Sequence, residues 1–349
     1  MWKKKKRIWR IKHARKIAKR KKRSKNRSVY YIKNKEKKKR NIPILRYTAP
    51  SKFSIIKNPN ETYEFFYKLM DGIRKNKQDI EVMINLSAVE ELTVDAIMYL
   101  LALICNTKVR KGYTITFKGN QPQNTSANRL LEESGFYNYV KSSKLQLRSS
   151  NDKIQIISGQ DVKPSAAGKI IEFINERCAT KISFTFGLYD ILIELMNNVI
   201  QHAYNENEFL DEKNWYLYAA DLENRIKLVF LDTGSGIAET VNRKFGEKLK
   251  DAVSKRTEDN VYIESALRGD YLRSETGEEN RGNGLPTIYK YAKSKEISKF
   301  RIHSGKAICK IRDTGKIDSK DLKDSLFGTL VYLEIKKDCI AKEHRYDYS

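Results

Sequence analysis

The chain has few cysteines and no long apolar segment. Its longest uninterrupted apolar run, Ala96 to Cys105, has ten residues, whereas a helix that spans a bilayer needs about 20. The four cysteines lie far apart and form no C-x-x-C pair, which argues against a zinc site or a disulfide framework. Residues 1–40 contain no apolar stretch of the kind that a secretory signal requires. We therefore expect a cytoplasmic protein that has no membrane segment.

Acidic residues are nearly missing from the first forty positions. Residues 1–40 hold 22 Lys and Arg but one acid, Glu36, so this segment carries most of the net charge of +26. Like charges at this density repel, and we expect a loose basic arm over residues 1–42. The aromatic residues interleaved with these charges and able to stack on bases are Trp2, Trp9, Tyr30 and Tyr31. The arm predicts a nucleic-acid partner, RNA or DNA, held through residues 1–40, with a nonspecific solubilising tail or a localisation signal as the alternative.

Residues 53–157 alternate between strand-like and helical patterns. The strand-like runs are 82–86 and 113–118, and the helical patterns are 94–109 and 125–134. Strands separated by helices of this length favour a small α/β sheet. The segment 151–165, with its glycine and proline, is predicted as the linker to a second folded region.

The second folded region, residues 165–337, begins with two helical patterns, 166–179 and 184–204. Strand-like runs follow at 215–221, 225–232, 297–303, 307–312 and 329–335. Helices on one side of such a mixed, mostly antiparallel sheet would form a two-layer α/β sandwich. Residues 338–349 are expected to be a tail.

The helical pattern 184–204 contains three polar residues at intervals of four, Glu194, Asn198 and His202. This spacing places them on one face in successive turns. A carboxylate and a carboxamide oxygen one turn apart could orient a water and hold Mg²⁺, which prefers oxygen ligands. For this helix alone, a solvated polar face is an equally good interpretation. The other histidine of the folded part, His303, is predicted to be an ordinary strand residue and not a ligand.

Glycines follow the strand-like run that ends at Asp232. The sequence Asp232-Thr233-Gly234-Ser235-Gly236-Ile237 lets the backbone bend tightly against a flat ligand. A carboxylate, which only accepts hydrogen bonds, suits the exocyclic amine of adenine. Alone, the pattern is also that of a simple Asp-Gly turn.

Two further glycine motifs come later in the chain. In Arg281-Gly282-Asn283-Gly284-Leu285-Pro286, glycines lead into a helical pattern, and backbone amides at such a start form an anion site for phosphates. The last strand-like run opens with Gly328-Thr329. Each motif is common when it stands by itself.

The order and spacing of the four elements are more specific than any one of them. E-L-x-x-N-x-x-x-H, D-x-G-x-G-I, G-x-G-L and G-T follow one another over residues 194–329. Together they resemble the Bergerat ATP-binding fold of the gyrase, Hsp90, histidine kinase and MutL superfamily. The histidine after Asn198 makes the chain most similar to the anti-sigma-factor serine kinase branch.

This resemblance implies ATP and Mg²⁺ as ligands. It implies that Glu194 is the catalytic residue, which activates or orients the attacking group, that Asn198 coordinates Mg²⁺, and that Asp232 binds adenine. The other cofactor-binding residues that it implies are His202 in the pocket wall, Gly234, Gly236 and Ile237 around the adenine, Gly282, Gly284 and Leu285 at the phosphates, and Thr329 near the base through a water. Residues 238–281 fall where the superfamily has its mobile ATP lid, with a solvated insertion as the alternative.

The earlier region has a resemblance of its own. The segment Ile84 to Val89, a helix that starts near Asp95, the strand-like run 113–117 and a Gly135-Phe136 pair are similar in order to the STAS domain, the anti-sigma-antagonist fold. That resemblance implies a protein partner. Phosphorylatable members have a serine where this chain has Asp95, which argues against a switch in which the ATPase phosphorylates its own STAS-like domain.

These features support three hypotheses. The first is a Mg-dependent, ATP-hydrolysing regulatory or effector protein whose arm binds nucleic acid, a combination that would suit a mobile-element or phage-defence system. The second is a protein serine/threonine kinase of the anti-sigma-factor type that acts on a partner protein. The third is a nucleic-acid-binding scaffold gated by ATP without turnover. Homodimerisation through the ATP domain is an expectation from the superfamily.

Overall fold

The computed structural model describes residues 42–107, 109–110, 113–140, 150–178, 182–202, 214–242, 258–270 and 284–337. The chain divides into two units, residues 1–43 and 44–349. Apart from Ile42, the predicted basic arm lies outside the described residues, as does the predicted tail at 338–349.

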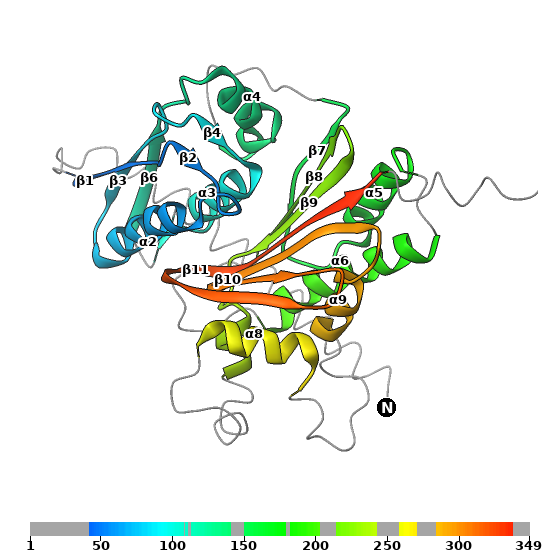
Figure 1. Cartoon of the computed structure of the whole chain (residues 1–349). Coiled ribbons are helices and arrows are strands. Elements are labelled where there is room, and N and C mark those ends of the chain that lie inside the picture. The colour runs from blue at the N-terminus through cyan, green and yellow to red at the C-terminus, as the bar shows by residue number, and fades with distance from the viewer. Residues whose placement is uncertain are drawn as a thin grey trace, which may run out of the picture. The chain divides into compact units, whose positions relative to one another are not determined.

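Residues 44–140, which we term the N-terminal lobe, form a four-stranded sheet with three main helices (Figure 1). The sheet order is β1-β3-β6-β5, with β1, β3 and β6 parallel and β5 antiparallel at one edge. The strands are β1 (Ile44–Thr48), β3 (Ile80–Asn85), β5 (Val109–Arg110) and β6 (Tyr113–Gly119), with a separate pair of β2 (Lys52–Phe53) and β4 (Glu91–Leu92). The helices are α2 (Pro59–Lys75), α3 (Val94–Thr107), α4 (Thr125–Glu133) and the short 3₁₀ turn η1 (Phe136–Asn138).

Helix α2 is absent from the sequence-based prediction, although its pattern is clear. Its buried residues recur at intervals of three or four, as in Phe66, Leu69, Met70 and Ile73. Pro59 opens the helix, where no intrahelical N–H bond is lost. Burying each of these large side chains contributes about 1.5–3 kcal/mol, so tertiary packing holds α2 in place.

Asp95, at the start of α3, has a structural role. Its side chain is 1% exposed, and Oδ1 accepts hydrogen bonds from the backbone N–H of Ile55 (2.7 Å) and Ile56 (3.3 Å) and from Thr93 Oγ1 (2.8 Å). These bonds fasten the turn after β2 to the first turn of α3. Asp95, which the STAS resemblance aligns with the phosphorylatable serine, is therefore buried, and its Oδ1 is hydrogen-bonded within the lobe.

Residues 150–337, the C-terminal lobe, contain a five-stranded antiparallel sheet in the order β10-β11-β9-β8-β7 (Figure 1). The strands are β7 (Lys153–Gly159), β8 (Trp215–Leu222), β9 (Arg225–Asp232), β10 (Ile297–Ile311) and β11 (Ile317–Lys336). The helices are α5 (Pro164–Asn175), α6 (Ile182–His202), α8 (Asp259–Arg268) and α9 (Gly284–Ala292). The mixed α/β class expected from the sequence is confirmed. In the described ranges, no helix has both the length and the apolar character needed to cross a bilayer.

The segment 151–165 differs from the predicted linker because it contains β7, which pairs with β8. Its isoleucines suit a strand, and Gly159 lies so close to the Trp215 ring that an added Cβ would come within 2.4 Å of it. The glycine therefore permits packing at a strand end. Strand β10 also differs from prediction, because it continues through a bulge at Gly305 (φ +59°) instead of ending there.

Both faces of the five-stranded sheet are apolar. One face packs with α5, α6, α8 and α9, and its residues include Trp215, Leu217, Leu228, Phe230, Val331 and Leu333. The opposite face packs with α2 and α3 of the N-terminal lobe, and its residues include Tyr216, Tyr218, Val229, Leu231, Leu330 and Tyr332. The sequence predicted helices on one side only, whereas the nearly continuous apolar runs of β8 and β9 place buried side chains on both faces.

Helix α8 occupies part of the predicted lid, residues 238–281. Its residues Ile263, Ala266 and Leu267 are fully buried in the C-terminal lobe. The backbone N–H groups of Asp259 (2.8 Å) and Asn260 (2.9 Å) donate to the Asp321 carboxylate of β11, which caps the helix from another element. This part of the predicted lid is thus packed on the β10–β11 pair, while residues 243–257 and 271–283 lie outside the described chain.

His303 of β10 joins the two lobes. Its Nδ1 lies 3.0 Å from the Tyr63 hydroxyl of α2, and its side chain is 1% exposed. Burial, reinforced by the positive charges of Arg301 and Lys310, lowers the pKa of His303 from 6.5 to about 3. His303 therefore lies on a strand, as predicted, and is in addition a neutral residue at the lobe interface.

This burial makes folding stability depend on pH. As the pH falls from about 6 to about 4, His303 is protonated in the unfolded chain but stays neutral in the folded one. This difference lowers the free energy of unfolding by about 1.4 kcal/mol per pH unit. We expect His303→Gln, which can still accept from Tyr63, to remove this slope. Urea unfolding at pH 7, 6, 5 and 4 measures it, and equal slopes for the two proteins would contradict the assignment.

Candidate functional site

The predicted adenine end forms where β9 meets β11. Asp232 is the last residue of β9, and Thr329 lies opposite it in the antiparallel register. The Asp232 carboxylate accepts a 2.8 Å hydrogen bond from the backbone N–H of Gly234. Two predicted site residues that lie far apart in sequence are therefore neighbours, with a carboxylate and a hydroxyl at the same strand end.

Two glycines allow this close approach. Gly236 and Gly328 have positive φ values of 85° and 83°, a region that residues with a side chain rarely adopt. An added Cβ at Gly328 would come 2.0 Å from the carbonyl oxygen of Asp232, and one at Gly236 would come 2.8 Å from Ser304 Oγ. The backbone is packed too tightly here for any side chain.

Ser304 of β10, which the sequence analysis missed, ties these segments together. Its Oγ accepts from the backbone N–H of Ile237 (2.8 Å), donates to the carbonyl of Gly328 (2.9 Å) and lies 3.1 Å from Thr329 Oγ1. The strand pattern around Ser304 gives no local signal for this role, because its contacts come from residues of β11 and of the segment after β9, which lie far away in sequence.

The predicted phosphate end lies between α6 and α9. Glu194 of α6 is half-buried, and burial raises the pKa of its carboxyl. Gly284, the first residue of α9, lies against it, so that an added Cβ would come 2.0 Å from Glu194 Oε1. Asn198 is half-buried one turn further along α6. A carboxylate with a raised pKa is suited to accept a proton, and the N-terminal end of a helix is suited to bind an anion.

Some predicted residues remain undescribed. His202 is the last residue of α6, and its side chain lies outside the described part, as does the whole of Gly282.

Ile237 and Leu285, one from each end of the site, pack against the same apolar cluster of the C-terminal lobe. The lobe core therefore supports both ends.

The donor set fits a nucleotide-bound Mg²⁺ better than a protein-only metal site. Within the described ranges, no group of three or more His, Cys, Asp or Glu is arranged to hold a metal. Glu194 and Asn198 instead supply two oxygen-bearing side chains next to the glycine start of α9. Magnesium usually takes one or two protein oxygens and completes its shell with phosphates and waters.

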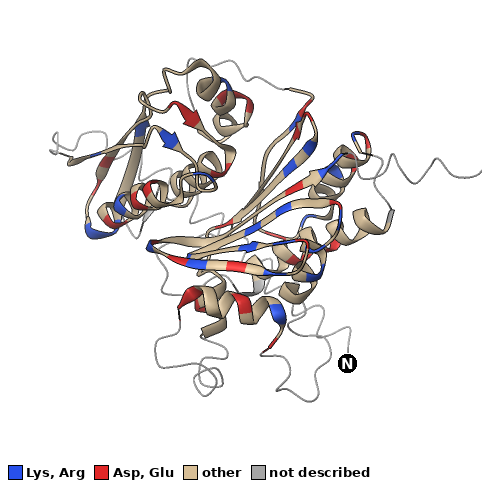
Figure 2. Cartoon of the chain, viewed as in Figure 1, with Lys and Arg blue, Asp and Glu red and all other residues tan. Residues whose placement is uncertain are grey.

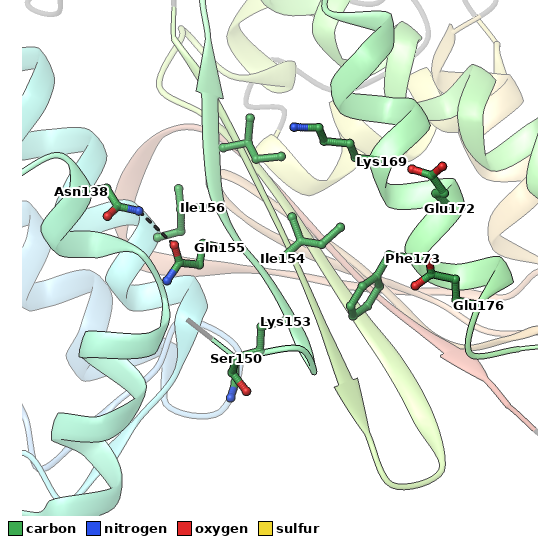
Figure 3. A pocket seen from close by; sticks show the side chains of 11 residues that line it. Asn138, Ser150, Lys153, Ile154, Gln155, Ile156, Lys169, Glu172, Phe173 and Glu176 are labelled. Carbon is green, nitrogen blue, oxygen red and sulfur yellow. Dashed lines mark hydrogen bonds between the residues drawn. The ribbon is translucent and has the colours of Figure 1, made fainter. Parts of the chain in front are cut away.

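A separate hollow of about 500 Å³ lies beside β7 and α5 (Figure 3). Its lining mixes Lys153 and Lys169 with Glu172 and Glu176, and contains none of the predicted nucleotide residues. Opposite charges spread along its walls give no preference for one class of ligand, so we do not assign a function to it.

Comparison with family models and with curated proteins finds no match to this chain. The interpretation of the site therefore depends on its own geometry and on the motifs in the sequence.

The close approach of Gly328 to Asp232 can be tested by adding one methyl group. We expect Gly328→Ala to lower the free energy of unfolding by about 2 kcal/mol or more, because both the φ value and the contact with a backbone oxygen oppose a Cβ. The matched control is Gly168→Ala in α5, where an added Cβ meets nothing within 4 Å; it should stabilise the chain by about 0.5–1 kcal/mol. Urea unfolding compares them, and equal effects would refute the described strand-end geometry.

Proposed function

We propose that this protein is a Mg-dependent ATPase of the Bergerat type. The observation that carries the proposal is the pairing of Asp232 with Thr329 at the end of β9, held by Gly328 and Ser304. The placement of Gly284 against Glu194 supports it at the opposite end. Each pair joins residues that the motif resemblance assigns to one part of a nucleotide.

The residues have distinct roles in this proposal. Asp232 accepts a hydrogen bond from the adenine amine, and the glycine start of α9 presents backbone N–H groups to the phosphates. Mg²⁺, held through Asn198, would neutralise charge on the phosphates. Glu194 orients a water and accepts a proton from it. The oxygen of this water attacks the γ-phosphorus, while the bond between the γ-phosphorus and the β–γ bridging oxygen breaks.

A pair of variants on α6 tests the role of Glu194. We expect Glu194→Gln to lower kcat for phosphate release by about 100-fold or more with little change in nucleotide affinity, since general-base catalysis contributes 10²–10⁴-fold. The control is Asp190→Asn, which removes an exposed carboxylate one turn away on the same helix. Turnover of the parent should also rise with pH through the raised pKa of Glu194.

Other outcomes have definite meanings. If Asp190→Asn lowered kcat as much as Glu194→Gln does, the effect would not be specific to Glu194 and its catalytic role would be refuted. Tight ATP binding without phosphate release by the parent would favour a ligand-gated scaffold. Transfer of labelled phosphate to a partner protein would favour the kinase alternative, for which a separate substrate is required because buried Asp95 occupies the corresponding position in this chain.

We further propose that the basic arm, residues 1–40, holds RNA or DNA. Its support is the charge contrast within the chain: the arm has 22 basic residues and one acid. Figure 2 shows Lys and Arg interspersed with Asp and Glu along the described helices and strands. Neighbouring opposite charges there cancel, so the polyanion attraction belongs to the arm.

Deleting residues 1–40 tests this part of the proposal. For the parent, we expect affinity for a single-stranded oligonucleotide to fall by about 10³-fold between 50 and 200 mM salt, as for six or more phosphate contacts. The deletion should lose both the affinity and this salt dependence, as measured by fluorescence anisotropy. A variant with Trp2, Trp9, Tyr30 and Tyr31 changed to Leu keeps the charge and separates base stacking from electrostatics. Unchanged binding by the deletion would refute the arm's role.

A further inference from the structure

The N-terminal lobe contacts the candidate site at the adenine end. Helix α3 sends two polar side chains across the lobe interface. Tyr99 reaches Phe327, the residue before Gly328, and Asn106 reaches Thr233, the residue after Asp232. Both connections lead to the same strand end.

The Tyr99 connection is a double one. Its hydroxyl accepts a hydrogen bond from the backbone N–H of Phe327 (2.7 Å) and donates to the carbonyl of the same residue (3.2 Å). Tyr99 is 1% exposed, and burial raises the pKa of its hydroxyl, so the proton needed for donation is retained. One buried side chain therefore fixes the backbone that enters Gly328, where an added Cβ would come 2.0 Å from the carbonyl oxygen of Asp232.

The Asn106 connection is part of a buried amide relay. Asn106 Nδ2 donates to Thr233 Oγ1 at 2.6 Å, and Asn106 Oδ1 accepts from Asn214 Nδ2 at 2.6 Å. All three residues are buried. Asn214 immediately precedes β8, whose first residue, Trp215, pairs with Asp232. The relay thus links the residue after Asp232 to the residue before Trp215, its partner on β8.

We propose that Tyr99 and Asn106 are positioning residues for the adenine end of the site, and that α3 couples adenine recognition to the N-terminal lobe. This inference rests on the proposed ATP-binding function. It follows that a nucleotide at Asp232 tightens the lobe contact, and by reciprocity a partner that alters α3 changes nucleotide affinity. The hydrogen bonds of Tyr99 and Asn106 make this coupling direct, so it requires no longer chain of interacting residues.

Tyr99→Phe is the sharpest test variant. The phenyl ring keeps the packing against Phe66, whose ring centroid lies 4.5 Å away, and only the two bonds to Phe327 are lost. The matched control is Arg301→Met, which removes another bond across the interface, from Arg301 Nη1 to the Ile56 carbonyl (2.9 Å). Arg301 pairs with Tyr332, three residues along β11 from Thr329, or about 10 Å from the adenine end.

The measurement is the Kd of the full-length protein for Mg-ADP and Mg-GDP by calorimetry, at about 150 mM salt so that attraction of phosphates to the arm is screened. We expect Tyr99→Phe to raise the Kd for Mg-ADP about tenfold, as for the loss of one or two buried hydrogen bonds. The Kd for Mg-GDP, whose base has a carbonyl oxygen at the position of the adenine amine and so cannot donate that hydrogen bond to Asp232, should change less than about twofold. Arg301→Met should change neither value.

Hydrogen exchange supplies a second readout, one that a purely structural role would not move. Mg-ADP should slow amide exchange in residues 99–107 in the parent and in Arg301→Met, but not in Tyr99→Phe. Equal weakening of ADP and GDP, or an unchanged Kd for ADP, would overturn the inference and leave the ATPase proposal standing. Failure of the parent to bind Mg-ADP would instead overturn the proposed function, and this inference with it.

Discussion

The burial of both faces of the five-stranded sheet is the constraint on which the rest of the structure depends. Alternation along β8 and β9 places large apolar residues on each side, and neither side can remain in water without a large loss of stability. Helices of the C-terminal lobe cover one face, and α2 with α3 cover the other. The two lobes are therefore parts of one folded body, although their sequence patterns look like those of separate domains.

This double coverage also decides which polar groups are buried. His303, Thr233 and Asn106 lie where the second layer meets the sheet, and each has a partner from the other side of the interface. A buried polar group without a partner costs about 1–3 kcal/mol, so any other arrangement of the lobes would leave these groups unpaired and would be less stable. The pairs therefore act mainly by favouring this one arrangement. The same pairs bring α3 next to the strand end that carries Asp232.

Local patterns predicted most of the elements but few of the contacts. Strand β9 and helices α3 and α6 were found nearly to the residue, because apolar runs and Gly or polar boundaries mark them. Helix α2 was missed, although its apolar spacing was visible. The extension of β11 back to Ile317 could not be predicted, because its polar residues are held by pairing with β10 and not by their own propensity. At the candidate site, Asp232 and Thr329 were predicted from motif order, whereas Ser304, Tyr99 and Asn106 depend on neighbours far away in sequence.

The position of strand β7 restricts where the chain can be cut into fragments that fold. Its backbone at Ile156 is bonded on the outer side by the carbonyl of Ser134 and the hydroxyl of Tyr139, so the N-terminal lobe shields an edge that could otherwise pair with another chain. A fragment cut in the segment 151–165 would separate this strand from its cover or from its sheet. The boundary suggested by glycine and proline is thus a poor place to cut, and the candidate site residues are best studied in a chain that keeps everything from β1 onward.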